Sequence, residues 1–200
     1  GTIDNANANT GVGVDVFASL TQGDNNVAIG NAAMNVTTTG VDSVAVGTSA
    51  LAAQTTGGDN IAIGHLALST LTTAGNNVAV GDRAMQVSTS GENNVAVGTL
   101  AMDANTTGGS NVGVGRDALG ANTTGSNNTA VGKSALNTTT TSSNNTGVGF
   151  QALYTLNGGV SNAALGHNAL FNATTADNNV AVGKSAMENV TSGSNNVAVG

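Results

Sequence analysis

The sequence contains no cysteine, proline or tryptophan, and its 200 residues include only one Tyr and three Phe. Without cysteine, neither a disulfide framework nor a cysteine metal site can form. The shortage of large aromatic side chains also argues against an ordinary globular core, because such side chains dominate most cores.

Basic side chains are scarce as well: four Lys and Arg stand against eleven Asp and Glu, for a formal net charge of −7. Arg83, Arg116, Lys133 and Lys184 are too few to follow a phosphate backbone, so we expect no nucleic-acid partner. No apolar run approaches membrane-spanning length, and no basic-then-apolar signal segment opens the chain. We therefore expect that this segment does not insert into a membrane.

The abundant residues are glycine, asparagine, threonine and serine, a composition typical of disordered chains. The spacing of the glycines argues against disorder. From Gly13 to Gly200 a glycine recurs every 17 residues, without insertion or deletion across eleven units. We therefore predict a decayed partial unit over residues 1–13 and an eleven-unit repeat domain over residues 14–200. Positions within a unit are numbered so that this glycine is position 17.

Each unit predicts strands and turns, because 17 residues are too few for a repeating pair of helices. Positions 14 and 16 are mostly β-branched with a small residue between them, the alternation typical of a strand. Position 3 is almost always Ala and position 4 is always large and apolar, so we predict a second short strand there. Positions 7–12 collect turn-forming residues. Stacked at roughly 4.8 Å per coil, eleven such units predict an all-β parallel β-solenoid.

Two columns of the repeat have structural explanations. A glycine at position 17 supplies positive φ at a tight corner. An Asn at position 13, replaced once by Ser43, predicts a ladder in which each amide bonds the next. The predicted corner glycines are Gly30, Gly47, Gly64, Gly81, Gly98, Gly115, Gly132, Gly149, Gly166 and Gly183. The predicted ladder consists of Asn26, Asn60, Asn77, Asn94, Asn111, Asn128, Asn145, Asn162, Asn179 and Asn196.

Position 15 is always Ala or Gly. If positions 14 and 16 point into the coil, position 15 points outward, and its small size then indicates close approach by another surface. We therefore predict that one face of the solenoid is covered by other copies of the chain, which makes the protein an obligate oligomer. The predicted inter-chain positions are Ala28, Ala45, Ala62, Ala79, Ala96, Ala130, Ala164, Ala181 and Ala198.

Residues that could carry chemistry are few, and we predict no catalytic residue, no metal and no cofactor. His65 and His167 occupy the variable position 1, where no Ser, Cys or carboxylate pairs with them in matching register. Asp42, Asp59 and the nearby Asp24 could bind Ca²⁺, but their place in the turn is explained by turn chemistry. The aromatic residues are too sparse for a stacking platform, although three of the four lie late in the chain and could form a local contact patch.

Several segments, such as 125–132 (Gly-Ser-Asn-Asn-Thr-Ala-Val-Gly) and 150–154 (Phe-Gln-Ala-Leu-Tyr), resemble the head repeats of trimeric autotransporter adhesins. They resemble even more the similar repeats of phage tail fibres. The resemblance covers the chain from about Asn9 to Gly200. It implies a left-handed parallel β-roll, three chains wound around a common axis, and a role in attachment. The chain shows no stalk, anchor or folding chaperone of these families, so we expect it to be a segment of a longer protein.

Together these observations predict a non-enzymatic extracellular fibre segment of a bacterial cell surface or a virion tail fibre. It would act as a homotrimer that contacts a surface receptor or glycan. Two alternatives remain. Open chain ends could stack head to tail into an extracellular filament. A monomeric solenoid could instead bind ice or glycans, but adjacent threonines at positions 8 and 9 do not form the alternating array that ice binding favours.

Overall fold

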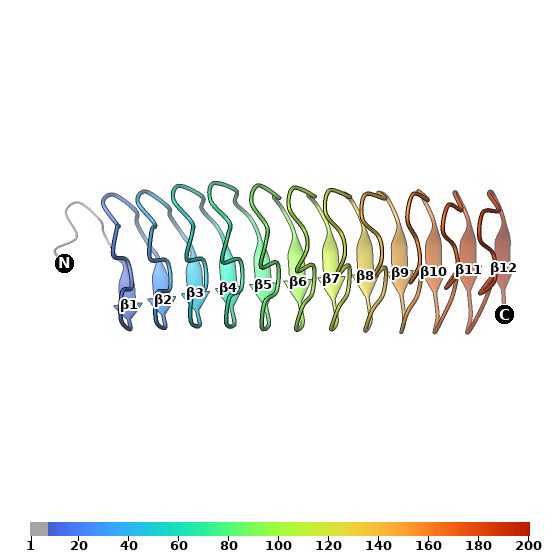
Figure 1. Cartoon of the computed structure of the whole chain (residues 1–200), viewed down its shortest axis with the longest axis horizontal. Helices are drawn as coiled ribbons and strands as arrows, with labels where there is room; N and C mark the ends of the chain where they lie inside the picture. The colour runs from blue at the N-terminus through green and yellow to red at the C-terminus, as the bar shows by residue number, and fades with distance from the viewer. Residues whose placement is uncertain (1–7) are drawn as a thin grey trace.

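The computed structural model describes residues 8–200, which form a parallel β-solenoid. Figure 1 shows its short strands side by side along a straight rod, each joined to the next by a loop that returns around the coil. Their bounds are β1 (Thr10–Val12), β2 (Val27–Ile29), β3 (Val44–Val46), β4 (Ile61–Ile63), β5 (Val78–Val80), β6 (Val95–Val97), β7 (Val112–Val114), β8 (Thr129–Val131), β9 (Thr146–Val148), β10 (Ala163–Leu165), β11 (Val180–Val182) and β12 (Val197–Val199). The predicted all-β parallel solenoid of 17-residue coils is confirmed.

Each strand pairs in parallel with the equivalent strand of the next unit, so the strand order in the sheet is the chain order. In the middle of the rod, Val78 pairs with Val95 and Ala79 with Ala96. In-register pairing stacks each position of the repeat into a column along the rod. At the N-terminal end Thr10 pairs with Val27, so the decayed unit joins the same sheet, although its residues 1–7 lie outside the described part of the chain.

The second short strand predicted at positions 3 and 4 is wrong. Positions 1–6 form a continuous series of turns. Positions 2 and 4 adopt the left-handed region, as Arg83 (φ 55°) and Met85 (φ 50°) illustrate. The reason is that positions 3 and 4 are both buried, whereas neighbouring residues of a strand point to opposite faces. The turns still bond between coils, since the Met85 amide donates to the Ala101 carbonyl at 3.0 Å.

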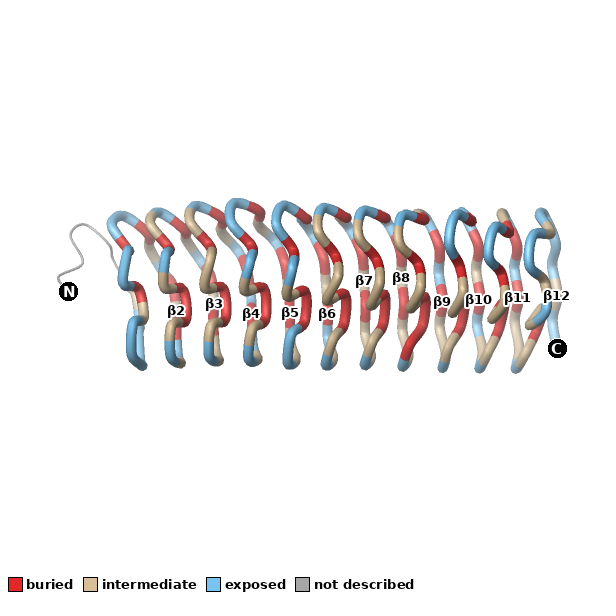
Figure 2. Tube along the Cα trace, viewed as in Figure 1, coloured by how far each residue is buried: buried red, intermediate tan, exposed pale blue. Residues whose placement is uncertain are grey.

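The core is a thin interior that runs the length of the rod, visible as the red bands of Figure 2. Six columns are buried along most of the rod, at positions 3, 4, 7, 10, 13 and 15. Position 4 supplies the largest of these side chains, such as Leu68, Met85 and Leu119, which are fully buried. Each chain therefore has its own core.

The prediction that position 15 faces other chains is wrong. The predicted inter-chain alanines from Ala28 to Ala181 are at most 2% exposed in one chain, and Ala198 in the last coil is half-buried. These residues are small because the coil is narrow: a Cβ on Gly113, also at position 15, would lie 2.9 Å from Met102 Cγ. The residues at positions 14 and 16 point outward instead.

Candidate functional site

The corner glycines adopt the positive φ predicted for them. From Gly13 to Gly200 the φ of position 17 lies between 127° and 143°. Residues other than glycine rarely adopt this backbone conformation. Space is also limiting, because a Cβ on Gly98 would lie 2.7 Å from both the carbonyl carbon and the carbonyl oxygen of Gly115. The glycines therefore let successive corners stack directly on one another.

The asparagine ladder is confirmed. The Asn94 side-chain oxygen accepts the Asn111 backbone N–H at 2.9 Å. The Asn94 side-chain nitrogen donates to the Gly108 carbonyl at 2.9 Å and to Asn77 Oδ1 at 3.2 Å. The column is buried along most of its length, so each amide satisfies backbone groups that would otherwise be costly to bury. The ladder is a structural spine of the solenoid.

Ser43 interrupts the ladder, and a glutamine from position 7 replaces the missing amide. Gln54 Nε2 donates to the Gly57 carbonyl at 2.5 Å and to Ser43 Oγ at 3.3 Å. In other coils a position-13 asparagine bonds the equivalent carbonyl, as Asn60 does at Ala74. Gln54 itself is fully buried.

Position 7 is a core column that the sequence reasoning missed. Leu71, Ser88, Asn105 and Leu156 all occupy it and are fully buried. Its composition varies so widely that it resembles a turn. The available signal was that five of the eleven units carry an apolar residue at this position, which no unit does at positions 8 and 9. Some of its polar groups bond within the column, since Asn122 Nδ2 donates to Asn105 Oδ1 at 2.8 Å.

The threonines at position 8 stabilise the turn, in keeping with the turn-forming composition predicted for positions 7–12. The Thr38 hydroxyl donates to the Thr55 carbonyl at 3.1 Å, and the Thr106 hydroxyl donates to the Thr123 carbonyl at 2.9 Å. These hydroxyls therefore link neighbouring coils.

The first and third residues of strands β2–β12 form the most extensive surface feature, which we call the apolar sheet face. Of its 22 positions, 19 are Val, Ile or Leu, and the others are Thr129, Thr146 and Ala163. Several side chains are exposed even in the middle of the rod, such as Ile63 at 41% and Val97 at 36%. No charged residue interrupts the face.

A second surface feature lies just beyond the corner glycines. The four Lys and Arg residues and both histidines of the chain occupy positions 1 and 2. In five successive coils position 1 carries a basic or aromatic residue, and we call this column the corner ridge: Arg116, Lys133, Phe150, His167 and Lys184. All five are exposed.

The three middle side chains of the corner ridge contact one another. Lys133 Nζ lies 5.8 Å from the centroid of the Phe150 ring, and the Phe150 ring stacks on His167 with centroids 5.1 Å apart. Arg116 Nε is paired with Asp117 Oδ2 at 3.2 Å. A second stacked pair, Tyr154 and Phe171, lies at position 5 of the same coils with centroids 5.2 Å apart. The late aromatic residues thus form two stacks.

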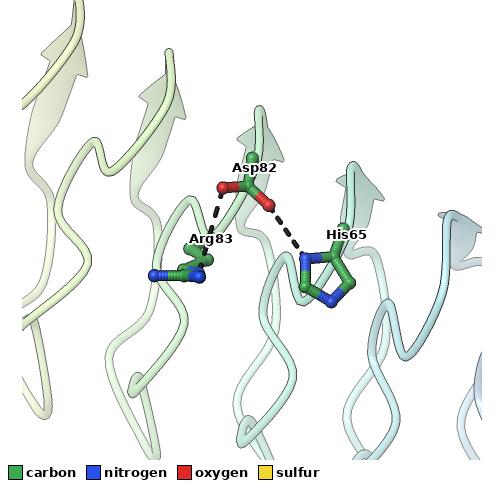
Figure 3. Close-up of polar contacts among 3 residues, drawn as sticks. All are labelled: His65, Asp82 and Arg83. Carbon is green, nitrogen blue, oxygen red and sulfur yellow. Dashed lines mark hydrogen bonds and ion pairs between the residues drawn. The ribbon is translucent and has the colours of Figure 1, made fainter.

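The statement that His65 has no carboxylate partner in matching register is wrong. Figure 3 shows Asp82, one coil further along the same column, between His65 and Arg83. His65 Nδ1 lies 2.9 Å from Asp82 Oδ1, and Arg83 Nε lies 3.9 Å from Asp82 Oδ2. The His65 and Asp82 side chains are 51% and 46% exposed, so water screens the pair and its contribution to stability is small.

The acidic residues considered for calcium act in turns. Asp42 and Asp59 have φ values of 51° and 58°, and Asp42 Oδ1 accepts a hydrogen bond from Asn25 Nδ2 at 3.0 Å. Within residues 8–200 no three His, Asp or Glu side chains gather as a metal site requires. Elsewhere, burial raises the pKa of Asp103 above its ordinary value of 3.8, and the nearby Asp117 adds to the rise.

Comparison with known proteins adds no relative: no family model, curated protein or solved structure matches the chain. In the described residues no helix is long and apolar enough to cross a membrane. The apolar sheet face and the corner ridge are therefore the two features from which a function can be argued.

Proposed function

We propose that the chain is a non-enzymatic segment of an extracellular fibre, in which the apolar sheet face of each copy packs against other copies around a common axis. The resemblance to adhesin-head and tail-fibre repeats adds a left-handed winding, a threefold assembly and a role in attaching a bacterial surface or a virion to its target.

The apolar sheet face is the observation that carries this proposal. At roughly 4.8 Å per strand, the eleven strands of the face span about 48 Å, and the two outward columns lie about 7 Å apart. The face thus covers on the order of 340 Å², within the range of the largest apolar patches on monomeric proteins, which often mark interaction sites. Its β-branched side chains stand in two straight columns, so a second copy can align along its whole length.

The face also explains why an oligomer is expected after the correction at position 15. The alanines at that position fill each chain's own core, whereas the neighbouring Val and Ile side chains remain partly exposed to water. Covering them removes apolar area from water at about 25 cal/mol per Å². The interface is therefore expected at positions 14 and 16.

Sedimentation equilibrium with two matched variants of one unit tests the proposal. Val112→Lys places a charge in the apolar sheet face, and Thr107→Lys places the same charge on an exposed turn of the same coil. We expect the unmodified chain and Thr107→Lys to sediment as three chains. We expect Val112→Lys to remain folded by circular dichroism but to sediment as one chain, because burying an unpaired ammonium is costly.

Other outcomes identify the alternatives. If the unmodified chain were a dimer and Val112→Lys dissociated it, the proposed interface would stand but the assembly would contain two chains instead of three. A monomeric unmodified chain would overturn the proposal, and thermal hysteresis in that sample would favour an ice-binding solenoid. Fibres that lengthen with concentration under the electron microscope would favour the head-to-tail filament.

A further inference from the structure

We propose that the corner ridge is a binding site for an anionic polysaccharide that lies along the rod. This inference rests on the proposed role in attachment and names the chemistry of the target. The ridge begins at Arg116 and ends at Lys184, so it spans four coil intervals, or roughly 19 Å at 4.8 Å per coil. That length suits several sugar residues of an extended chain.

The arrangement of the ridge favours a negatively charged ligand. Lys133, Phe150, His167 and Lys184 follow one another at the same position of successive coils, and all are exposed. An aromatic ring carries partial negative charge on its faces and partial positive charge at its edge. Lys133 lies over the Phe150 ring and His167 stacks against it. The Phe150 edge is therefore the part left for a ligand, and its partial positive charge has the same sign as the Lys133 and Lys184 ammonium groups.

Acidic side chains leave most of the ridge uncompensated. Asp117 pairs with Arg116 at one end. Glu188 lies at position 5 rather than at the ridge, and it accepts a hydrogen bond from Asn168 Nδ2 at 3.4 Å. Asp177 belongs to the opposite turn, where it accepts the Val160 N–H at 2.8 Å. Positive charge is thus concentrated at the corner even though the whole chain carries a net charge of −7.

A polysaccharide suits the ridge better than a nucleic acid does. Single-stranded nucleic acids bind by stacking bases on aromatic faces, and here the Phe150 ring has Lys133 and His167 against it. Duplex recognition needs many phosphate contacts, and the chain has four Lys and Arg in total. Sugars offer carboxylates for the cations together with hydroxyls for polar neighbours such as Asn168 and Ser185, which follow ridge residues in the sequence.

The ridge stays accessible in the proposed fibre. Position 1 follows the corner glycine and belongs to the turns, whereas the apolar sheet face belongs to the strands. Binding to the ridge and packing between copies therefore use different surfaces, and three copies would present three ridges whose avidity adds.

Titration of the full chain with polygalacturonate tests the inference, with neutral dextran and a thymidine oligonucleotide as comparison ligands. The test variant is Lys133→Thr/Phe150→Thr/Lys184→Thr, because threonine already occupies this column at Thr48 and Thr99. Arg83→Thr removes a cation away from the ridge and serves as the control. We expect polygalacturonate to bind the unmodified chain and Arg83→Thr equally, with affinity falling as salt is raised. The triple variant should bind at least tenfold more weakly.

Three results would overturn the inference: no binding of polygalacturonate, equal binding by the triple variant, or equal binding of neutral dextran. Preferred binding of the oligonucleotide would assign the ridge to nucleic acid instead. Sedimentation of the same samples separates this inference from the proposed function. A monomer that binds through the ridge rejects only the fibre assembly, and a trimer that binds no polygalacturonate rejects only the ridge.

Discussion

At the residue scale, the coil depends on backbone conformations that most side chains resist. In each coil the residues at positions 2, 4 and 12 have φ values between 48° and 63°. For residues other than glycine this region costs roughly 1–2 kcal/mol. Asn and Asp at position 12 tolerate it well, but Leu and Met at position 4 do not. Hydrogen bonds between coils and burial of the position-4 side chains must offset that cost.

The corner glycine is the residue at which a substitution should be least tolerated. Gly98→Ala introduces a Cβ at φ 139°, 2.7 Å from the Gly115 carbonyl. We expect a loss of more than about 2 kcal/mol in the free energy of unfolding, measured by urea denaturation. Gly109→Ala is the control, since its Cβ would meet its nearest atom, the Glu92 carbonyl oxygen, at 3.2 Å. Equal midpoints for the two variants would contradict the argument.

Asp103 should make stability depend on pH in a defined direction. Burial raises its pKa in the folded chain, so the folded state holds the proton more tightly than the unfolded state does. The stability contributed by protonation is therefore present below the ordinary pKa of 3.8 and is lost as pH rises through the folded pKa. Above that window the ionised, partly buried carboxylate is a constant penalty.

Asp103→Asn should consequently raise the unfolding midpoint at pH 7 by an amount worth less than about 1 kcal/mol, because the site is partly solvated. The difference from the unmodified chain should shrink as the pH falls below 4. Asp59→Asn removes the same charge from an exposed turn and controls for net charge. A gain that persists unchanged at pH 3 would show that ionisation of Asp103 is not its cause.

At the element scale, the strand and the ladder were predictable to different degrees. The three-residue strand, the corner glycine and the asparagine ladder follow from columns of nearly constant composition, so the sequence identified them. The direction of the strand's side chains did not follow, since Val-Ala-Val alternates equally well in either orientation. What decides it is the interior: Met85 and Leu119 at position 4 fill the thin coil and leave room only for a methyl group.

The two candidate surfaces were less predictable still. The prediction of an inter-chain surface at position 15 took positions 14 and 16 to point into the coil, and packing inside the narrow coil reverses that orientation. The corner ridge depends on contacts between side chains 17 residues apart, such as Phe150 with His167. The cations of the ridge lie far apart in the sequence, and the in-register stacking of the coils brings them into one column.

The repair of the ladder at Ser43 predicts strong coupling between two positions. Ser43→Asn alone should crowd Gln54, and Gln54→Leu alone should leave the Gly57 carbonyl without its amide donor. Together the two changes restore the combination of a position-13 Asn with a position-7 Leu of the next coil, as at Asn60 with Leu71 and at Asn145 with Leu156. We expect each single variant to be destabilised and the double variant to recover, with a coupling energy of about 1–3 kcal/mol. A urea denaturation cycle measures this, and additive effects would contradict the proposed replacement.

At the scale of the whole molecule, each coil contacts mainly the coils on either side, so length should be adjustable one unit at a time. Deleting residues 99–115 joins Gly98 to Arg116 and keeps every column in register. We expect a folded protein that is shorter by roughly 4.8 Å. Small-angle scattering and circular dichroism check the length and the strand content.

Deleting residues 99–107 instead removes about half a unit and is the matched control. It would place polar turn residues where Met102 and Ala101 now fill the core, so we expect loss of the solenoid downstream of the junction. If both deletions left the same strand content, the columns would not be what holds the coils together.

The direction of the hydrogen bonds determines how such a rod yields to force. The strand-to-strand bonds run along the rod axis (Figure 1), so a pull on the two ends stretches them directly and opens one coil before the next. An opened coil of 17 residues reaches about 58 Å at 3.4 Å per residue, against the roughly 4.8 Å it occupied when stacked. Under tension the rod would lengthen stepwise and dissipate work at each step, so an attachment could stretch before it breaks.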